Sequence, residues 1–184
     1  MSSSPLHLIH TKLGIPESYA SSCGLASHED CVDLVPTELD VFGRQPYLER
    51  NANVAWQRMR QAAATDGVQL QLISAFRSVQ YQAELFERKL ARGDAIERIL
   101  TVNAAPGFSE HHSGRALDIG TPGVAYLEEE FEGSAAFAWL QMHAHQFGFR
   151  LSFPRGNSHG VMYEPWHWFY AGTANEPIAH DNYS

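Results

Sequence analysis

The chain of 184 residues has little of several things that would mark out its class. It holds only two cysteines, too few for a disulfide scaffold. Its apolar stretches are much shorter than the roughly 20 residues of a membrane-spanning helix. Basic residues are also few, with 13 Lys and Arg against 21 Asp and Glu and a formal net charge of −8. Because nucleic acids and anionic membranes are polyanions, this charge excludes both as main partners.

The two cysteines, Cys23 and Cys31, allow two interpretations. They are either free thiols in a reducing compartment or one local disulfide, and the disulfide would indicate export. The N-terminus lacks the basic and apolar regions of a secretory signal. We therefore expect a cytoplasmic protein, or a periplasmic or exported one if a signal has been trimmed away. Nothing in the sequence indicates an oligomeric state.

The composition is that of a folded globular protein, with 44% hydrophobic and 18% charged residues. We expect a single domain over residues 1–184, in which residues 1–46 are mostly irregular because they are rich in Pro, Gly and Ser and lack periodicity. The later pattern predicts helices over 47–65, 78–90, 94–100 and 134–147, started by Ser78, Asp94 and Ser134 in the last three, and strands over 68–74, 115–119, 149–153 and 166–170. This order predicts an α+β fold with a small antiparallel sheet flanked by helices.

Two segments carry the chemistry, Ser109–Asp118 (SEHHSGRALD) and Tyr163–His167 (YEPWH). Together they supply two imidazoles and one carboxylate that can bind a metal, and a further carboxylate that can act as a base. A catalytic zinc ion needs three such protein ligands, an open position for water and a nearby base. The sequence therefore indicates a zinc peptidase.

In the first segment, His111 in a loop and Asp118 in a strand can converge on one ion if Gly114 turns the backbone. His112 competes with His111 for the ligand role. Adjacent residues of an extended segment point in opposite directions, so only one of the two histidines should bind.

In the second segment, Glu164 and His167 are three residues apart and would diverge in a regular strand. Pro165 disfavours a regular strand, and a bend there can bring both side chains to one cavity. Trp166 and Trp168 would then pack beside the site or form its wall.

The motifs Ser-x-His-x-x-Gly-x-Ala-x-Asp and Glu-Pro-Trp-His, with the upstream segment Ser74-Ala-Phe-Arg77-Ser78-x-x-x-Gln82, resemble the VanY-like zinc D-alanyl-D-alanine carboxypeptidases. That family shares its fold with lysostaphin-type peptidases and hedgehog domains. The resemblance extends from about residue 33 to residue 172. Three blocks in the right order make it specific.

The resemblance implies a role for each matching position. Zinc would be bound by His111, Asp118 and His167, with Glu164 as the general base. Arg77 would bind and polarise the substrate near the scissile amide or its terminal carboxylate, and Gln82 and Ser109 would help to hold the terminal D-alanine.

The chain departs from the family pattern at two positions, Phe169 and Arg115. Relatives often carry Arg at the first and an aliphatic residue at the second. These changes concern the outer pocket and substrate preference rather than the metal chemistry.

We therefore expect a zinc carboxypeptidase that releases the terminal D-alanine from peptidoglycan stem peptides or muropeptides. The missing export signal favours an L,D-enzyme acting on tetrapeptides during recycling over a D,D-enzyme acting on pentapeptides. The alternatives are an endopeptidase of the phage-lysin type and a catalytically silent zinc-binding module, and the presence of Glu164 and Arg77 argues against the silent module.

Overall fold

The computed structural model describes residues 4–172. The α-helices are α1 (Pro5–Leu13), α2 (Tyr19–Ser22), α3 (Arg50–Thr65), α4 (Val79–Ala91), α5 (Ile96–Val102) and α6 (Ala135–His143). The 3-10 helices are η1 (Glu110–Ser113), η2 (Glu129–Gly133) and η3 (Ala144–Phe147). The strands are β1 (Leu34–Pro36), β2 (Tyr47–Glu49), β3 (Gln71–Ser74), β4 (Ala116–Gly120), β5 (Phe149–Leu151) and β6 (His167–Tyr170).

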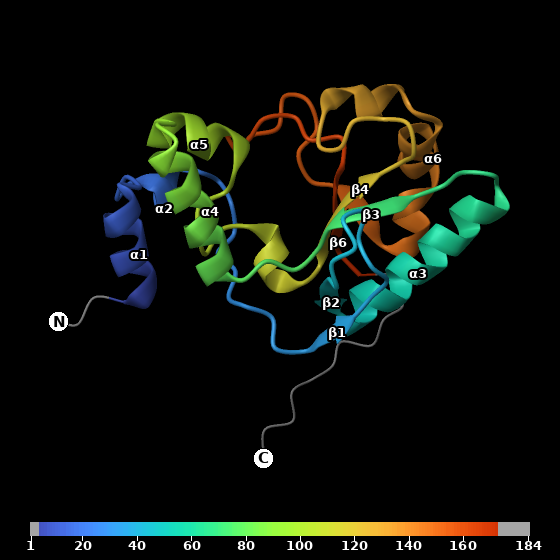
Figure 1. Ribbon diagram of the computed structural model, residues 1–184, viewed down its shortest axis with the longest axis horizontal. Helices are drawn as coiled ribbons and strands as arrows, with labels where there is room; N and C mark the ends of the chain where they lie inside the picture. The colour runs from blue at the N-terminus through green and yellow to red at the C-terminus, as the bar shows by residue number, and fades with distance from the viewer. Residues whose placement is uncertain (1–3, 173–184) are drawn as a thin grey trace, which may run out of the picture.

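The strands form two antiparallel sheets. One is the β1–β2 pair, and the other has four strands in the order β3-β4-β6-β5. The larger sheet lies between two groups of helices, with α3 and α6 on one side and α1, α2, α4 and α5 on the other (Figure 1). This arrangement confirms the predicted α+β fold with a small antiparallel sheet.

Strand alternation divides the side chains of β4 between two environments. Leu117 and Ile119 are fully buried and belong to a core that also contains Trp56 and Met59 of α3 and Leu140 of α6. Asp118, between the two aliphatic residues, points to the opposite face of the sheet. One strand thus supplies both the core and a buried carboxylate.

A second, smaller core joins the other helices. It contains Leu13 of α1, Tyr19 of α2, Phe86 of α4 and Ile99 of α5, with Phe108 from the loop before η1. The segment that precedes the motif histidines is therefore anchored in this second core. The polar face of the sheet lies between the two cores.

The first 46 residues hold more regular structure than the sequence analysis predicted. Ser4 caps α1 by accepting a hydrogen bond from the His7 N–H, and Pro5 occupies the first turn. Leu13, at the end of α1, is buried in the second core. These signals define a helix too short to show sustained periodicity, and its stability depends on packing against α4.

Some predicted boundaries were also wrong. Residues 47–49 are strand β2, not helix, and α3 starts after Glu49, whose carboxylate accepts hydrogen bonds from the Asn51 and Ala52 N–H groups. Strand β3 starts at Gln71 rather than Val68. Ala95, not Asp94, precedes α5, without a side-chain cap. Ser78 and Ser134 cap α4 and α6 as predicted.

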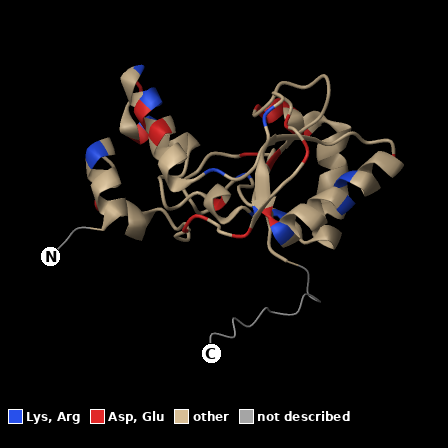
Figure 2. Cartoon of the chain, turned by 60° about the horizontal axis from the view of Figure 1, so that its bottom comes forward, with Lys and Arg blue, Asp and Glu red and all other residues tan. Residues whose placement is uncertain are grey.

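Charged positions occur both on the helices and on the loops between the two helix groups (Figure 2). Cys23 and Cys31 are both free thiols in the structure, so the local disulfide is not formed. Over residues 4–172, no helix combines the length and apolar character that crossing a membrane requires.

Candidate active site

Asp118 and His167 are cross-strand partners in the larger sheet. The two residues are directly opposite each other in the antiparallel β4–β6 ladder. Opposed side chains of such a pair lie on the same face, with their Cβ atoms about 5 Å apart. The sheet therefore brings together two residues that are 49 positions apart in the chain.

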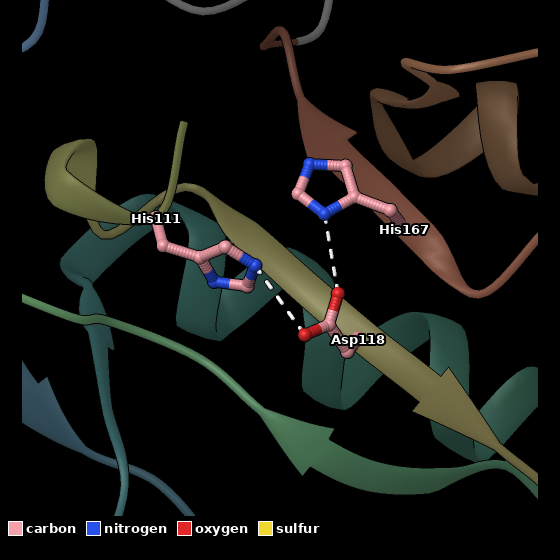
Figure 3. A group of neighbouring side chains, drawn as sticks. All are labelled: His111, Asp118 and His167. Carbon is pink, nitrogen blue, oxygen red and sulfur yellow. Dashed lines mark hydrogen bonds and ion pairs between the residues drawn. The ribbon is translucent and has the colours of Figure 1, made fainter. Parts of the chain in front are cut away.

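His111 reaches the same place from η1, which ends just before β4. The capping residue Gly114 has a φ of 67°, as the sequence analysis expected of a glycine that turns the chain. A Cβ at this position would lie 2.9 Å from the Glu49 backbone nitrogen, so the turn also leaves no room for a side chain. The predicted convergence of loop and strand is confirmed (Figure 3).

The three side chains present a set of ligand atoms that fits one metal ion. Nδ1 of His167 lies 3.1 Å from Asp118 Oδ1, and Nε2 of His111 lies 3.4 Å from Asp118 Oδ2. One ligand atom from each residue can be chosen so that all lie within 4.8 Å of one another. Two donors bound to a tetrahedral zinc ion at about 2.0–2.1 Å are about 3.3 Å apart. The two imidazole–carboxylate separations, which involve different oxygens of Asp118, are close to this spacing.

The hydrogen bonding of His111 also leaves a ligand atom free. Its Nδ1–H donates to the Ala75 carbonyl at 2.6 Å, which places the lone pair of the neutral ring on Nε2. Within residues 4–172, this buried Nε2 has no hydrogen-bond partner. A buried polar atom without a partner is costly, and a metal ion would satisfy it.

His112 is excluded from the site, although the reason differs from the predicted one. The pair lies in a 3-10 turn rather than an extended segment. The fully buried His112 donates from Nδ1 to the Arg77 carbonyl (2.6 Å) and accepts at Nε2 from the Gly107 N–H (3.1 Å). Both of its nitrogens are therefore used in fixing loops.

Glu164 lies beside the three ligands. The chain bends before β6, since the His167 N–H donates to the Glu164 carbonyl, and this turn brings a Glu164 carboxylate oxygen to 3.8 Å from His167 Nδ1. The expected bend is confirmed. Burial raises the pKa of Glu164 to about 7, and the neighbouring His167 offsets only part of that effect. A carboxyl with such a pKa can accept and return a proton near neutral pH.

The three ligand residues themselves are strongly coupled in the absence of a metal. Burial lowers the pKa of His111 to about 4, with Arg77 acting in the same direction. Burial also opposes the charge of His167, but hydrogen bonds to Asp118 and Glu110 outweigh it and raise its pKa to about 10. The two imidazoles hold the pKa of Asp118 well below its usual range despite its burial. The site thus carries a proton on His167 that a cation would replace.

A cleft of about 340 Å³ opens at this centre and is lined by Asp118, Glu164 and Arg77. Within the described residues, the buried Nε of Arg77 has no hydrogen-bond partner. Trp166 also lines the cleft, whereas Trp168 is a core residue whose Nε1–H donates to the Pro165 carbonyl. Trp166 therefore forms part of the cleft wall, and Trp168 packs in the core.

Gln82 and Ser109 do not line this cleft. Gln82 is buried in α4 and donates to the Ala104 carbonyl at 2.9 Å, while its amide oxygen has no partner among residues 4–172. Ser109 is buried and caps η1 by accepting from the His111 N–H. Their role in holding the terminal D-alanine remains a prediction.

Sequence reasoning missed Glu110, the residue between Ser109 and His111. Its Oε2 accepts a hydrogen bond from Nε2 of His167 at 2.9 Å, and its Oε1 pairs with Arg150 at 3.0 Å. The contact joins residues 57 positions apart. No signal short of the strand register would have revealed it.

The two departures from the family pattern are neighbours in space. The Arg115 guanidinium lies 5.5 Å from the centre of the Phe169 ring, and that of Arg150 lies 4.8 Å from the same ring. Neither Arg115 nor Phe169 lines the cleft. Phe169 thus packs against Arg150, the partner of Glu110, and neither departure forms part of the cleft wall.

Comparison with known proteins agrees with this geometry. The model of one family, described as VanY, D-alanyl-D-alanine carboxypeptidase, matches residues 45–173. The chain belongs to this carboxypeptidase family. The match contains the whole constellation described above, from Arg77 to His167. Membership of the VanY family agrees with the resemblance seen in the motifs.

A curated relative, the putative carboxypeptidase YodJ of Bacillus subtilis, is 31% identical over 185 residues. The alignment covers 96% of this chain but 63% of the relative, so the chain spans less than two thirds of that protein's length.

Two solved structures share the fold. The LdcB LD-carboxypeptidase, whose structure bears on peptidoglycan recognition, matches with a TM-score of 0.71 and 28% identity over 79% of this chain and 71% of that one. The vancomycin resistance D,D-pentapeptidase VanY, a mutant in complex with Zn(II), matches with a TM-score of 0.58 and 27% identity over 79% of this chain and 86% of that one. Both bond specificities therefore occur among the structural neighbours of this VanY-family chain.

Proposed function

We propose that this protein is a zinc-dependent carboxypeptidase that releases the terminal D-alanine from peptidoglycan stem peptides. The observation that carries the proposal is the buried group of His111, Asp118 and His167, with Glu164 beside it and the cleft in front. A silent metal-binding module would have no need of a carboxyl group with a pKa of about 7 at this place. Family membership and the Zn(II)-bound neighbour support the same metal.

Each side chain has a definite task in this proposal. Zinc supplies Lewis-acid activation of water and of the scissile carbonyl. Glu164 accepts the proton of the attacking water and delivers it to the leaving amine of D-alanine. The free guanidinium N–H of Arg77 pairs with the substrate carboxylate or with the oxygen that gains negative charge.

For the bond that is cut, we propose L,D-specificity, on the diamino acid–D-alanine bond of the tetrapeptide. The greater similarity to the LdcB LD-carboxypeptidase supports this choice. The D,D-pentapeptidase neighbour supports the alternative, cleavage of D-alanyl-D-alanine. Both reactions use the same groups, so specificity lies in how the cleft accepts the residue before the terminal D-alanine.

The test is to incubate the zinc-loaded protein with purified tetrapeptide and pentapeptide muropeptides, with and without a chelator, and to identify the products by mass. We expect D-alanine release from the tetrapeptide that stops when the metal is removed. Glu164→Gln should lower turnover by roughly 10²–10⁴-fold while zinc stays bound. Release from neither substrate, or release that persists in chelator, would overturn the proposal.

A further inference from the structure

Glu110 lies on the far side of His167 from the metal group. The imidazole is held at both nitrogens, by Asp118 Oδ1 at 3.1 Å from Nδ1 and by Glu110 Oε2 at 2.9 Å from Nε2. The His167 side chain is 4% exposed and that of Glu110 is 12% exposed. The contact with Glu110 is therefore shielded from water and is not an exposed ion pair.

The chemistry of the carboxylate decides which nitrogen of His167 carries a proton. An ionised carboxylate only accepts hydrogen bonds, so Nε2 must donate. A neutral imidazole has one N–H, and fixing it on Nε2 leaves the lone pair on Nδ1, the atom that faces Asp118. The contact thus selects the tautomer that can bind a metal.

The tautomer of His111 is fixed in the same way, by a different acceptor. There the Ala75 carbonyl accepts the Nδ1–H at 2.6 Å, and Nε2 is left free. The two imidazoles therefore expose opposite nitrogens, Nε2 and Nδ1, to one point. A main-chain carbonyl holds His111 and a side chain holds His167, so only the acceptor of His167 can be removed by a substitution.

Glu110 is itself held in place by other groups. Arg150 donates to Oε1 at 3.0 Å, and the Ser152 hydroxyl is a further hydrogen-bond partner of the carboxyl group. The two carboxylate oxygens are thus occupied by different partners, which fixes the rotation of the group. Because Glu110 faces the nitrogen that points away from Asp118, it cannot be an additional ligand of the same ion.

We propose that Glu110 is the positioning residue of the metal centre, which holds His167 in the Nε2–H tautomer and so presents Nδ1 to the ion. This inference rests on the proposed function, since it requires a metal at the His111–Asp118–His167 group. Its partners Arg150 and Ser152 act through Glu110. Carboxylates that orient a ligating histidine typically change metal affinity by about 10- to 100-fold when they are removed.

The experiment measures zinc affinity by chelator competition for three variants of the full chain. Glu110→Leu keeps the approximate volume but has no acceptor, and we expect its affinity to fall by about 10- to 100-fold. Glu110→Gln keeps a carbonyl oxygen that accepts the Nε2–H and should lie between Glu110→Leu and the original protein. Glu87→Leu, a control at a half-exposed acid of α4 that pairs with Lys12, should bind zinc unchanged. An affinity of Glu110→Leu within twofold of the original, or equal affinities of the Leu and Gln variants, would overturn the inference.

A second measurement keeps the test valid if Glu110→Leu does not fold. Nuclear magnetic resonance of the ¹⁵N-labelled, zinc-loaded protein should show a slowly exchanging ring proton on Nε2 of His167, and Glu110→Gln should shift this resonance. A ring proton on Nδ1 would refute the inference. If the original protein binds no zinc, the proposed function fails, whereas normal zinc binding and hydrolysis in Glu110→Leu remove only the role of Glu110.

Discussion

Asp118 and His167 are directly opposed in the β4–β6 ladder, and their side chains meet at 3.1 Å on the polar face of the sheet. The neighbours of Asp118 in the same strand, Leu117 and Ile119, are fully buried in the core on the other face. The geometry of the metal group is therefore tied to the packing of the protein.

Glu164 should lower the stability of the metal-free protein at neutral and alkaline pH. Its folded pKa of about 7 lies above the unfolded value, so its contribution is most favourable below about pH 4 and is lost as the pH rises through 7. The full cost at pH 8 is at most about 4 kcal/mol. We expect Glu164→Gln to be more stable than the original protein in urea unfolding at pH 8 and of equal stability at pH 4. Equal stability at both values would show that the carboxylate is well solvated.

Metal binding should displace one proton from His167. At neutral pH the metal-free ring is doubly protonated because its pKa is about 10, whereas His111, with a pKa of about 4, is already neutral. Zinc affinity should therefore fall about tenfold for each pH unit between 8 and 6. The measurement is best made on Glu164→Gln, which removes the other group that titrates in this range. An affinity independent of pH would contradict the assignment.

His112 should position Arg77 through the main chain. Replacing this fully buried ring with Leu leaves the Arg77 carbonyl and the Gly107 N–H without their partner, at about 1–3 kcal/mol for each buried group. We expect His112→Leu to lower both stability and kcat/KM, with kcat/KM still reduced well below the melting transition. The exposed His145→Leu serves as the control. Loss of stability with unchanged kinetics would limit His112 to a structural role.

Gly114 should be less tolerant of a side chain than a glycine with a similar backbone elsewhere. A Cβ at Gly114 would meet the Glu49 nitrogen and the Leu34 side chain at 2.9 Å, whereas at Gly67, with a φ of 76°, it would meet nothing within 4 Å. Gly67→Ala should cost about 1 kcal/mol, the strain of a left-handed alanine. Gly114→Ala should cost clearly more and also weaken zinc binding by moving His111. Equal losses in thermal unfolding would show that the neighbours of Gly114 yield.

The local signals in the sequence were sufficient for much of the fold. Ser78 and Ser134 mark helix starts because capping depends only on neighbouring residues. Strand β2 was missed because three residues carry no periodicity, and its conformation depends on pairing with β1. Helix α1 was missed for a similar reason, since its buried end is defined by α4.

The candidate site also contains residues that the sequence predicts and one that it does not. His111, Asp118, Glu164 and His167 could be predicted because their types and spacing follow metal chemistry and a known motif. The task of Glu110 could not be predicted, because it depends on which residue of β6 faces η1. That relation is a property of the sheet register and of the turn at Gly114, and neither is written in the neighbouring residues.

The alternation within β4 means that a shift in strand pairing cannot weaken the metal group gradually. A slip of one residue would turn the Asp118 carboxylate into the hydrophobic core that contains Trp56. It would also place an aliphatic side chain where a cation would bind. Such a misaligned molecule would be both inert and unstable. Correct strand pairing and the geometry of the metal group therefore depend on the same few backbone hydrogen bonds.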